Sequence, residues 1–270
     1  MSLKYGCRRN ERCTAGPINI MPVPGYGRGV VALVPIQKGE CVLRERPFLV
    51  VPTYRETENT VEAMNAETQR VHTIQAKRVA DLSPFHSKMF YSLQDHRTPK
   101  GYPRSLHGIL STNSFACEAP FEMAESSCMC VEASMFNHSC APNLCRYWDK
   151  EAGEMVFHTV RDVAAGEQLT INYCRTFDGR KDRQDKLGRY AINCTCPVCS
   201  LSDEESAARD AKCARYKDTR KERLGKHAIA LGLERLDLAE ELCFQEQDSM
   251  LDCYKGLMLT CLAFRDTIDT

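Results

Sequence analysis

Three cysteines within six residues form a dense group of potential metal ligands. Cys194, Cys196 and Cys199 lie too close along the chain for all three to act as independent core residues. A tight turn can direct three thiolates at one ion, and tetrahedral zinc then requires a fourth ligand from elsewhere. The spacing therefore predicts a metal site that recruits one further side chain.

The wider cysteine content also favours thiols over disulfides. The chain has 16 cysteines, and its first 14 residues are polar and charged, without the apolar core of a secretory signal. We therefore expect a reducing compartment, the nucleus or the cytoplasm. Most of the other cysteines lie apart and are expected to be small buried hydrophobes. The pair Cys128 and Cys130 stays unassigned, because their side chains would point to opposite faces of a strand.

Composition and charge narrow the classes of partner. The chain has 36 basic and 36 acidic residues, a formal net charge of zero and a hydrophobic content of 43%. A sizeable core is therefore expected, while direct nucleic-acid binding is not indicated. No run approaches the ~20 consecutive apolar residues that span a bilayer, so no membrane partner is expected either.

Short β-branched runs broken by glycine and proline predict strands on both sides of a helical stretch. Helices are expected from about residue 56 to 80, where apolar residues recur among charges without glycine or proline, and from Ser83 to about Leu93. A turn-forming stretch covers residues 22–29, and residues 175–189 have the composition of a solvated helix. The predicted strands are 30–34, 41–45, 48–51, 144–148, 155–160 and 168–173.

The chain beyond the cysteine cluster has a helical composition. An acidic linker or cap covers residues 202–206, and no proline occurs from Ala207 onward. Residues 232–244 predict one helix, and Met250, Tyr254, Leu257 and Cys261 lie on one face of the next. This apolar stripe must pack on the main domain or on a protein partner.

Four motifs occur together in a recognisable order. They are Gly27-Arg28-Gly29 with Lys38-Gly39-Glu40, then Asn137-His138-Ser139-Cys140-Ala141-Pro142-Asn143, then Gly166-Glu167-Gln168-Leu169-Thr170-Ile171-Asn172-Tyr173, and finally the cysteine cluster. Over roughly residues 20–200 the chain resembles SET-domain protein lysine methyltransferases, nearest to SET and MYND proteins and their fungal relatives. It departs from the SET and MYND proteins in having no MYND-type Cys/His zinc-binding insertion. Residues 53–107 instead read as helical and contain no cysteine.

The resemblance implies an α+β fold with a β-rich SET domain of the β-clip, or pseudoknot, type. An irregular segment over residues 1–19 would precede a SET domain over 20–175, which carries a helical insertion at about 53–107. A zinc-binding post-SET segment would cover residues 176–200, and a helical C-terminal region residues 201–270.

The same resemblance implies S-adenosylmethionine as the cofactor. A Gly-x-Gly turn lets the backbone approach a ligand closely, because neither glycine has a Cβ. In the family an aromatic residue near the cysteine cluster often stacks on adenine, and this chain has Ile192 at that position. His138 would act chiefly through its backbone. The positions carried over are Tyr26, Gly27, Arg28, Gly29, Asn113, Asn137, His138, Tyr173 and Ile192.

By resemblance, Cys140 supplies the fourth metal ligand. The implied set is Cys140, Cys194, Cys196 and Cys199, which would hold one zinc ion. Four thiolates leave no position open for water, so this zinc is expected to be structural and not catalytic.

Tyr173 is the residue that the resemblance assigns to catalysis. Methyl transfer from a sulfonium to an amine is an in-line displacement that requires a neutral lysine and close alignment. Free lysine titrates at ~10.4, and a desolvated channel can lower that value. A tyrosine hydroxyl beside the sulfonium can position the methyl group and the amine, and alignment can lower a barrier by ~7–11 kcal/mol.

The implied activity is methylation of an exposed lysine on a histone or another protein, with the C-terminal helices as a further surface for a protein partner. Two alternatives stay open. One is a non-catalytic SET-like module that binds partners through its helical tail, which the departure at Ile192 and the lack of a MYND insertion favour. The other is a SET scaffold that acts on a small molecule.

Overall fold

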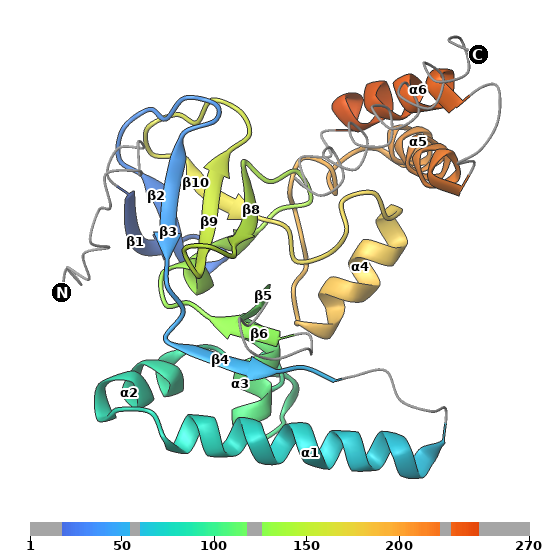
Figure 1. Ribbon diagram of the computed structural model, residues 1–270. Helices are drawn as coiled ribbons and strands as arrows, with labels where there is room; N and C mark the ends of the chain where they lie inside the picture. The colour runs from blue at the N-terminus through green and yellow to red at the C-terminus, as the bar shows by residue number, and fades with distance from the viewer. Residues whose placement is uncertain (1–17, 55–59, 118–125, 222–227, 243–270) are drawn as a thin grey trace, which may run out of the picture. The chain divides into compact units, whose positions relative to one another are not determined.

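The structure is a computed structural model that describes residues 18–54, 60–117, 126–221 and 228–242. The chain forms two compact units. The first unit comprises Met1–Phe136 and Tyr147–Gln168, and the second comprises Asn137–Arg146 and Leu169–Thr270. Helices and small sheets both occur, as the predicted α+β class requires (Figure 1).

A hairpin opens the first unit. Strands β1 (Ile18–Val23) and β2 (Gly27–Ala32) pair antiparallel, from Ile18 opposite Ala32 to Val23 opposite Gly27. Between them the Tyr26 N–H donates to the Val23 carbonyl at 3.0 Å, and Gly25 has a φ of +79°. Pro24 followed by a glycine with positive φ is the signature of a type II turn.

This hairpin corrects two sequence-based predictions. The irregular segment over residues 1–19 ends earlier than predicted, because Ile18 and Asn19 already belong to β1. The turn over residues 22–29 is shorter, since Pro22 and Val23 are in β1 and β2 begins at Gly27. Proline cannot donate to a ladder but is tolerated on an edge strand, and β1 is at the end of its sheet.

A second sheet of the first unit contains β3 (Cys41–Glu45), β9 (Glu154–Thr159) and β8 (Leu144–Asp149), whose residues from Tyr147 onward belong to this unit. Strand β9 lies between β3 and β8. The Arg44 side chain on β3 forms ion pairs with Asp149 and Glu154, and its Nε is 3.0 Å from the Glu154 carboxylate. These pairs cross-link the three strands.

A third sheet carries the helical insertion. Strand β6 (Ser126–Met129) pairs antiparallel with both β4 (Leu49–Pro52) and β5 (Ser114–Cys117). Helices α1 (Val61–Ala80), α2 (Pro84–Ser92) and α3 (Leu106–Asn113) gather at this sheet (Figure 1). Their shared core consists of Leu49, Val51, Val79, Phe90, Leu93, Ile109, Leu110 and Met129.

The two helices predicted between residues 56 and 93 are confirmed by α1 and α2. Each begins at a hydroxyl residue. The Thr60 side chain accepts from the Ala63 N–H, and the Ser83 side chain accepts from the His86 N–H. Such side chains satisfy N–H groups that the first helical turn leaves without partners.

The second unit begins with a short parallel pair. Strand β7 (Asn137–His138) lies beside β10 (Gln168–Ile171), with Asn137 opposite Thr170 and His138 opposite Ile171. The pairing continues past β7, because the Ser139 N–H donates to the Ile171 carbonyl at 2.9 Å. The Asn-His-Ser-Cys motif is therefore held along the strand that leads to Tyr173.

Three helices follow in the second unit. Helix α4 (Arg180–Arg189) begins five residues later than the polar stretch predicted at 175, and it buries Arg183 and Leu187. Helices α5 (Asp203–Lys221) and α6 (Ala228–Glu241) enclose a small core of Phe177, Cys213, Tyr216, Ala239 and Leu242. The predicted stripe from Met250 to Cys261 lies outside the described residues.

Within residues 18–54, 60–117, 126–221 and 228–242, no helix combines the length and apolar character that crossing a membrane requires.

Candidate metal centre and cofactor-binding residues

The second unit brings four thiols together. The sulfur atoms of Cys140, Cys194, Cys196 and Cys199 all lie within 4.8 Å of one another, and the Cys140 and Cys199 sulfurs are 3.5 Å apart. Three of the cysteines are buried, and Cys199 is half-buried. The structure thus gathers the four residues that the sequence resemblance named as metal ligands.

Local hydrogen bonds explain how the downstream segment presents its thiols. The N–H groups of Cys199 and Ser200 both donate to the Cys196 carbonyl, at 2.9 and 3.0 Å. The Ser200 hydroxyl donates to the Thr195 carbonyl at 3.1 Å. This tight turn folds the Cys-x-Cys-x-x-Cys segment back on itself, so that its thiols face one point.

The dimensions of the cluster fit a tetrahedral thiolate site. Zn–S bonds of ~2.3 Å imply sulfur–sulfur edges of about 3.8 Å, close to the separations in the cluster. The four cysteines are free thiols and form no disulfide. Hydrogen bonds within the cluster, from Cys140 first, lower the pKa of the Cys196 and Cys199 thiols, whereas those from Cys174 first raise the pKa of Cys140. A bound metal ion would displace the protons that remain on the cluster.

A buried guanidinium gives independent support for an anionic centre. Arg183 on α4 has no exposed surface, and its Nη1 donates to the Asp178 carbonyl. Its other contacts are with the Cys140 and Cys199 sulfurs. Burial lowers the pKa of Arg183, but the Cys140 and Cys199 sulfurs outweigh this effect and raise it. One zinc ion with four thiolates carries two negative charges, which a buried cation would offset in part.

Two further side chains lie at the same cluster. His138, Cys140 and Cys174 place their ligand atoms within 4.8 Å of one another, and all three residues are buried. Cys174 is one of the isolated cysteines, most of which the sequence predicts to be small buried hydrophobes. Its position directly after Tyr173, three residues beyond the end of β10, is the signal that could have found it.

Tyr173 is held by its backbone against His138. The Tyr173 N–H donates to His138 Nδ1 at 2.9 Å, and the two ring centroids are 5.3 Å apart. Although 39% of Tyr173 is exposed, burial of its hydroxyl raises the pKa to about 12, with Arg146 opposing the shift. The phenol therefore stays protonated at neutral pH and can act as a hydrogen-bond donor.

Two other predicted cofactor-binding residues, Ile192 and Asn137, also belong to the second unit. Ile192 is partly buried against the thiol cluster, and its N–H donates to the Leu187 carbonyl at 3.1 Å. An aliphatic side chain there packs on the cysteines and offers no ring for stacking. Asn137 is half-buried on β7, opposite Thr170.

The predicted positions of the first unit lie at the β1–β2 turn and at the end of α3. Gly27 has a φ of +74°, and a Cβ added to it would meet nothing within 4 Å, so the backbone there is open. Arg28 donates from Nη2 to the Ser92 carbonyl at 3.4 Å. The Asn113 amide nitrogen donates to the Gln94 and Ile109 carbonyls, at 2.8 and 2.7 Å. The Asn113 amide group therefore helps to hold the end of α3.

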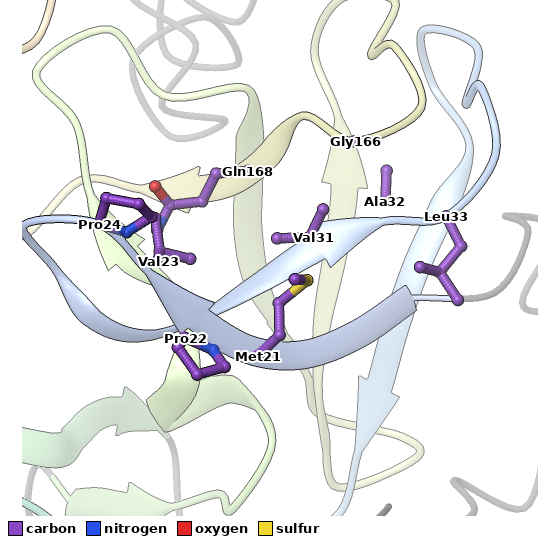
Figure 2. A pocket seen from close by; sticks show the side chains of 9 residues that line it. All are labelled: Met21, Pro22, Val23, Pro24, Val31, Ala32, Leu33, Gly166 and Gln168. Atoms are coloured by element: carbon purple, nitrogen blue, oxygen red, sulfur yellow. The ribbon is translucent and has the colours of Figure 1, made fainter.

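A cavity of about 420 Å³ lies beside the same hairpin (Figure 2). Most of its wall is apolar, and none of the predicted cofactor-binding residues lines it. The lining residues are Met21, Pro22, Val23, Pro24, Val31, Ala32, Leu33, Gly166 and Gln168. Three of these residues, Met21, Pro22 and Val23, pair across the hairpin with Gly29, Arg28 and Gly27.

A comparison with protein families identifies the fold. The model of the SET domain matches residues 27–174, more than half of the chain. The chain belongs to the SET-domain family. The match includes the glycine turn, Asn113, the Asn137–Cys140 motif and Tyr173, whereas the cysteines at 194, 196 and 199 lie beyond it.

Individual relatives share this SET domain at low identity. A putative SET domain-containing protein of Acanthamoeba polyphaga mimivirus is 24% identical over 66% of this chain and 75% of its own length. Histone-lysine N-methyltransferase set5 of Schizosaccharomyces pombe is 24% identical over 69% of this chain and 51% of its own length. Human histone-lysine N-methyltransferase SMYD3 is 31% identical over 27% of this chain and 17% of its own length. The chain thus matches about half of set5 and a small part of SMYD3.

Proposed function

We propose that this protein transfers a methyl group from S-adenosylmethionine to the side-chain amine of a protein lysine. The observation that carries the proposal is the position and environment of Tyr173. Tyr173 is the penultimate residue of the matched SET domain, its backbone is held by His138, and its hydroxyl, like that of any tyrosine with a pKa of 10 or above, is protonated at neutral pH. A neutral phenol at this position is suited to orienting groups and not to removing a proton.

The proposed reaction needs alignment more than it needs a strong acid or base. The bond between the sulfonium sulfur and the methyl carbon breaks while a bond from the lysine nitrogen to that carbon forms. The lysine must lose its proton to solvent beforehand, because an ammonium has no lone pair. A hydrogen bond from the Tyr173 hydroxyl would hold the amine or the methyl donor in line, and such alignment can lower a barrier by ~7–11 kcal/mol.

The residues proposed to hold the cofactor belong to both units. In the first unit they are Tyr26, Gly27, Arg28, Gly29 and Asn113. In the second they are Asn137, His138, Tyr173 and Ile192. The open backbone at Gly27 supports close approach of a ligand, and the aliphatic Ile192 predicts weaker adenine binding than an aromatic residue would give.

We propose one structural zinc ion at Cys140, Cys194, Cys196 and Cys199. When bound, it would supply a rigid link between the loop after β7 and the segment after α4. It would have no open position for a substrate or water. The clustered thiols and the buried Arg183 guanidinium support this assignment.

A protein lysine is the proposed acceptor because two relatives carry the name histone-lysine N-methyltransferase. Histone and non-histone proteins both remain candidates. The cysteine usage is the basis for proposing a nuclear or cytoplasmic location.

Titration calorimetry with S-adenosylmethionine, followed by transfer of labelled methyl groups to a panel of histones and lysate proteins, tests this function. We expect cofactor binding and transfer by the native chain, and at least a tenfold lower kcat for Tyr173→Phe. Tyr102→Phe, which changes an exposed tyrosine, should leave transfer unaltered. A folded chain that binds no cofactor would instead support the non-catalytic module. Transfer that is indifferent to Tyr173→Phe would refute the role of the phenol.

A further inference from the structure

The hydrogen bond between Tyr173 and His138 determines where the imidazole carries its proton. The backbone N–H of Tyr173 can only donate, so Nδ1 of His138 must accept through its lone pair at 2.9 Å. A neutral imidazole has one N–H group and one acceptor nitrogen. The remaining proton of His138 therefore resides on Nε2.

That Nε2–H group faces a predicted metal ligand. His138 Nε2 is 3.3 Å from the sulfur of Cys140, and the two residues are 4% and 2% exposed. A buried N–H group needs an acceptor, and a thiolate is a stronger acceptor than a neutral thiol because it is charged. The tautomer set by Tyr173 is thus the one that can donate to a sulfur, and both the Cys140 and Cys174 sulfurs lie within reach of the ring.

We propose that His138 is a positioning residue that links the metal centre to Tyr173. On one side its ring donates to the Cys140 thiolate, and on the other it accepts from the Tyr173 backbone. The proposal rests on the proposed function only in assigning catalysis to Tyr173. The hydrogen bonds themselves, and their dependence on a bound metal, can be measured without any methyl acceptor.

The link works in both directions. Donation from Nε2–H disperses negative charge on the sulfur, which makes the thiolate less basic and harder for protons to displace from a metal. Conversely, a metal-bound thiolate fixes the ring and therefore the acceptor that holds the Tyr173 N–H.

Cys174 offers a competing arrangement. Its sulfur, the Cys140 sulfur and a His138 nitrogen lie close enough for the three residues to ligate a second ion. Ligation through Nε2 by a neutral imidazole would move its proton to Nδ1. Nδ1–H would then face the Tyr173 N–H, so that two donors would meet at 2.9 Å. The observed hydrogen bond therefore favours His138 as a donor to the metal site and not as a ligand.

Nuclear magnetic resonance of the full chain loaded with ¹¹³Cd²⁺ and labelled with ¹⁵N-histidine tests the link directly. We expect a protonated Nε2 on His138 and a scalar coupling from that proton to cadmium through the Cys140 sulfur. A protonated Nδ1, or direct coupling between the Nε2 nitrogen and cadmium, would overturn the proposal. So would a cadmium-loaded protein in which this coupling is absent.

Variants of His138 test the consequences for the metal and for Tyr173 separately. His138→Leu removes both hydrogen bonds, so zinc affinity, measured by chelator competition, should fall about 10–100-fold. If the chain methylates, its kcat should fall at least tenfold. His138→Gln, which keeps a donor and an acceptor, should recover part of both losses, and His158→Gln, in the first unit, should change neither.

These readouts separate the two proposals. A chain that shows the cadmium coupling but transfers no methyl group would contradict the proposed function and leave the hydrogen-bonded link intact. A chain that methylates while His138→Leu leaves zinc affinity and kcat unchanged would contradict the link alone. Should His138→Leu not fold, the native chain's cadmium spectrum decides.

Discussion

Arg183 is a buried cation at the thiol cluster. Its guanidinium is fully buried and interacts with the Cys140 and Cys199 sulfurs. A buried charge without compensation costs several kcal/mol. The thiol cluster, once deprotonated around a metal ion, supplies the missing negative charge.

We therefore expect Arg183→Met to weaken zinc binding about 10–100-fold, as the loss of an outer partner of a metal site usually does. Competition against a chromophoric chelator measures this affinity. Arg183→Lys keeps the charge and should give a smaller loss. Lys181→Met, at an exposed position of the same helix, is the matched control, and equal affinities for Arg183→Met and the native chain would contradict the electrostatic role.

Glu45 is a second residue whose environment shifts its pKa. Its carboxylate accepts the N–H groups of Val131, Glu132 and Ala133 at the start of a short 3-10 helix, η2 (Ala133–Met135). Desolvation nevertheless raises the pKa of Glu45 from 4.5 to about 7, since it outweighs these hydrogen bonds. The folded chain thus holds this proton more tightly than the unfolded chain does.

Stability should consequently depend on pH through Glu45. A raised pKa contributes stability that is fully present below about pH 4.5 and is lost as the pH rises through about 7. Denaturant unfolding should show a lower free energy of unfolding at pH 8 than at pH 5.5, and Glu45→Gln should make this difference smaller. Glu151→Gln, at an exposed position, should retain the native dependence, and the same slope in both variants would contradict this assignment.

At the scale of elements, α3 is held by a buried carboxylate at its start. Asp95 accepts from the N–H groups of Arg97 and Ser105, and it packs against Gly108 of α3. A Cβ at Gly108 would lie 2.1 Å from an Asp95 carboxylate oxygen. The glycine is required here by the close approach of the Asp95 side chain and not by its own backbone angle.

Gly108→Ala should therefore destabilise the chain by about 1–3 kcal/mol, because the Asp95 carboxylate must move. Gly188→Ala is the matched control on α4, since its Cβ would meet nothing within 4 Å. That change should be neutral or should stabilise the chain by up to about 1 kcal/mol. Chemical denaturation compares the two, and equal effects would contradict the predicted clash.

The sequence predicted elements best where local pattern and packing agree. Strands such as β3 and β9, and helices α1 and α2, have residues whose period and breaks match their structure. Strand β1 was missed because Pro22 reads as a turn residue, and only its place at a sheet edge makes it acceptable. The burial of Arg183 was missed for a similar reason, since a charged residue on a polar helix gives no local sign of the thiols nearby.

At the scale of the whole molecule, the predicted site residues divide between two units. The thiol cluster, His138, Tyr173 and Ile192 all belong to the second, while the glycine turn and Asn113 belong to the first. The order of the motifs along the chain was enough to predict which residues are site residues. It could not reveal the hydrogen bond from Tyr173 to His138 or the position of Cys174, because both depend on how β7 and β10 pair.

The central claim is that this SET domain methylates lysine, and the identity of the modified amino acid tests it most directly. The full chain, loaded with zinc, is incubated with a cell lysate and S-adenosylmethionine bearing a labelled methyl group, and the labelled peptides are sequenced by mass spectrometry. We predict label on lysine side-chain nitrogen, and its loss with Tyr173→Phe. Label on another residue type or on small molecules alone, or no label from a folded, cofactor-binding chain, would contradict the account.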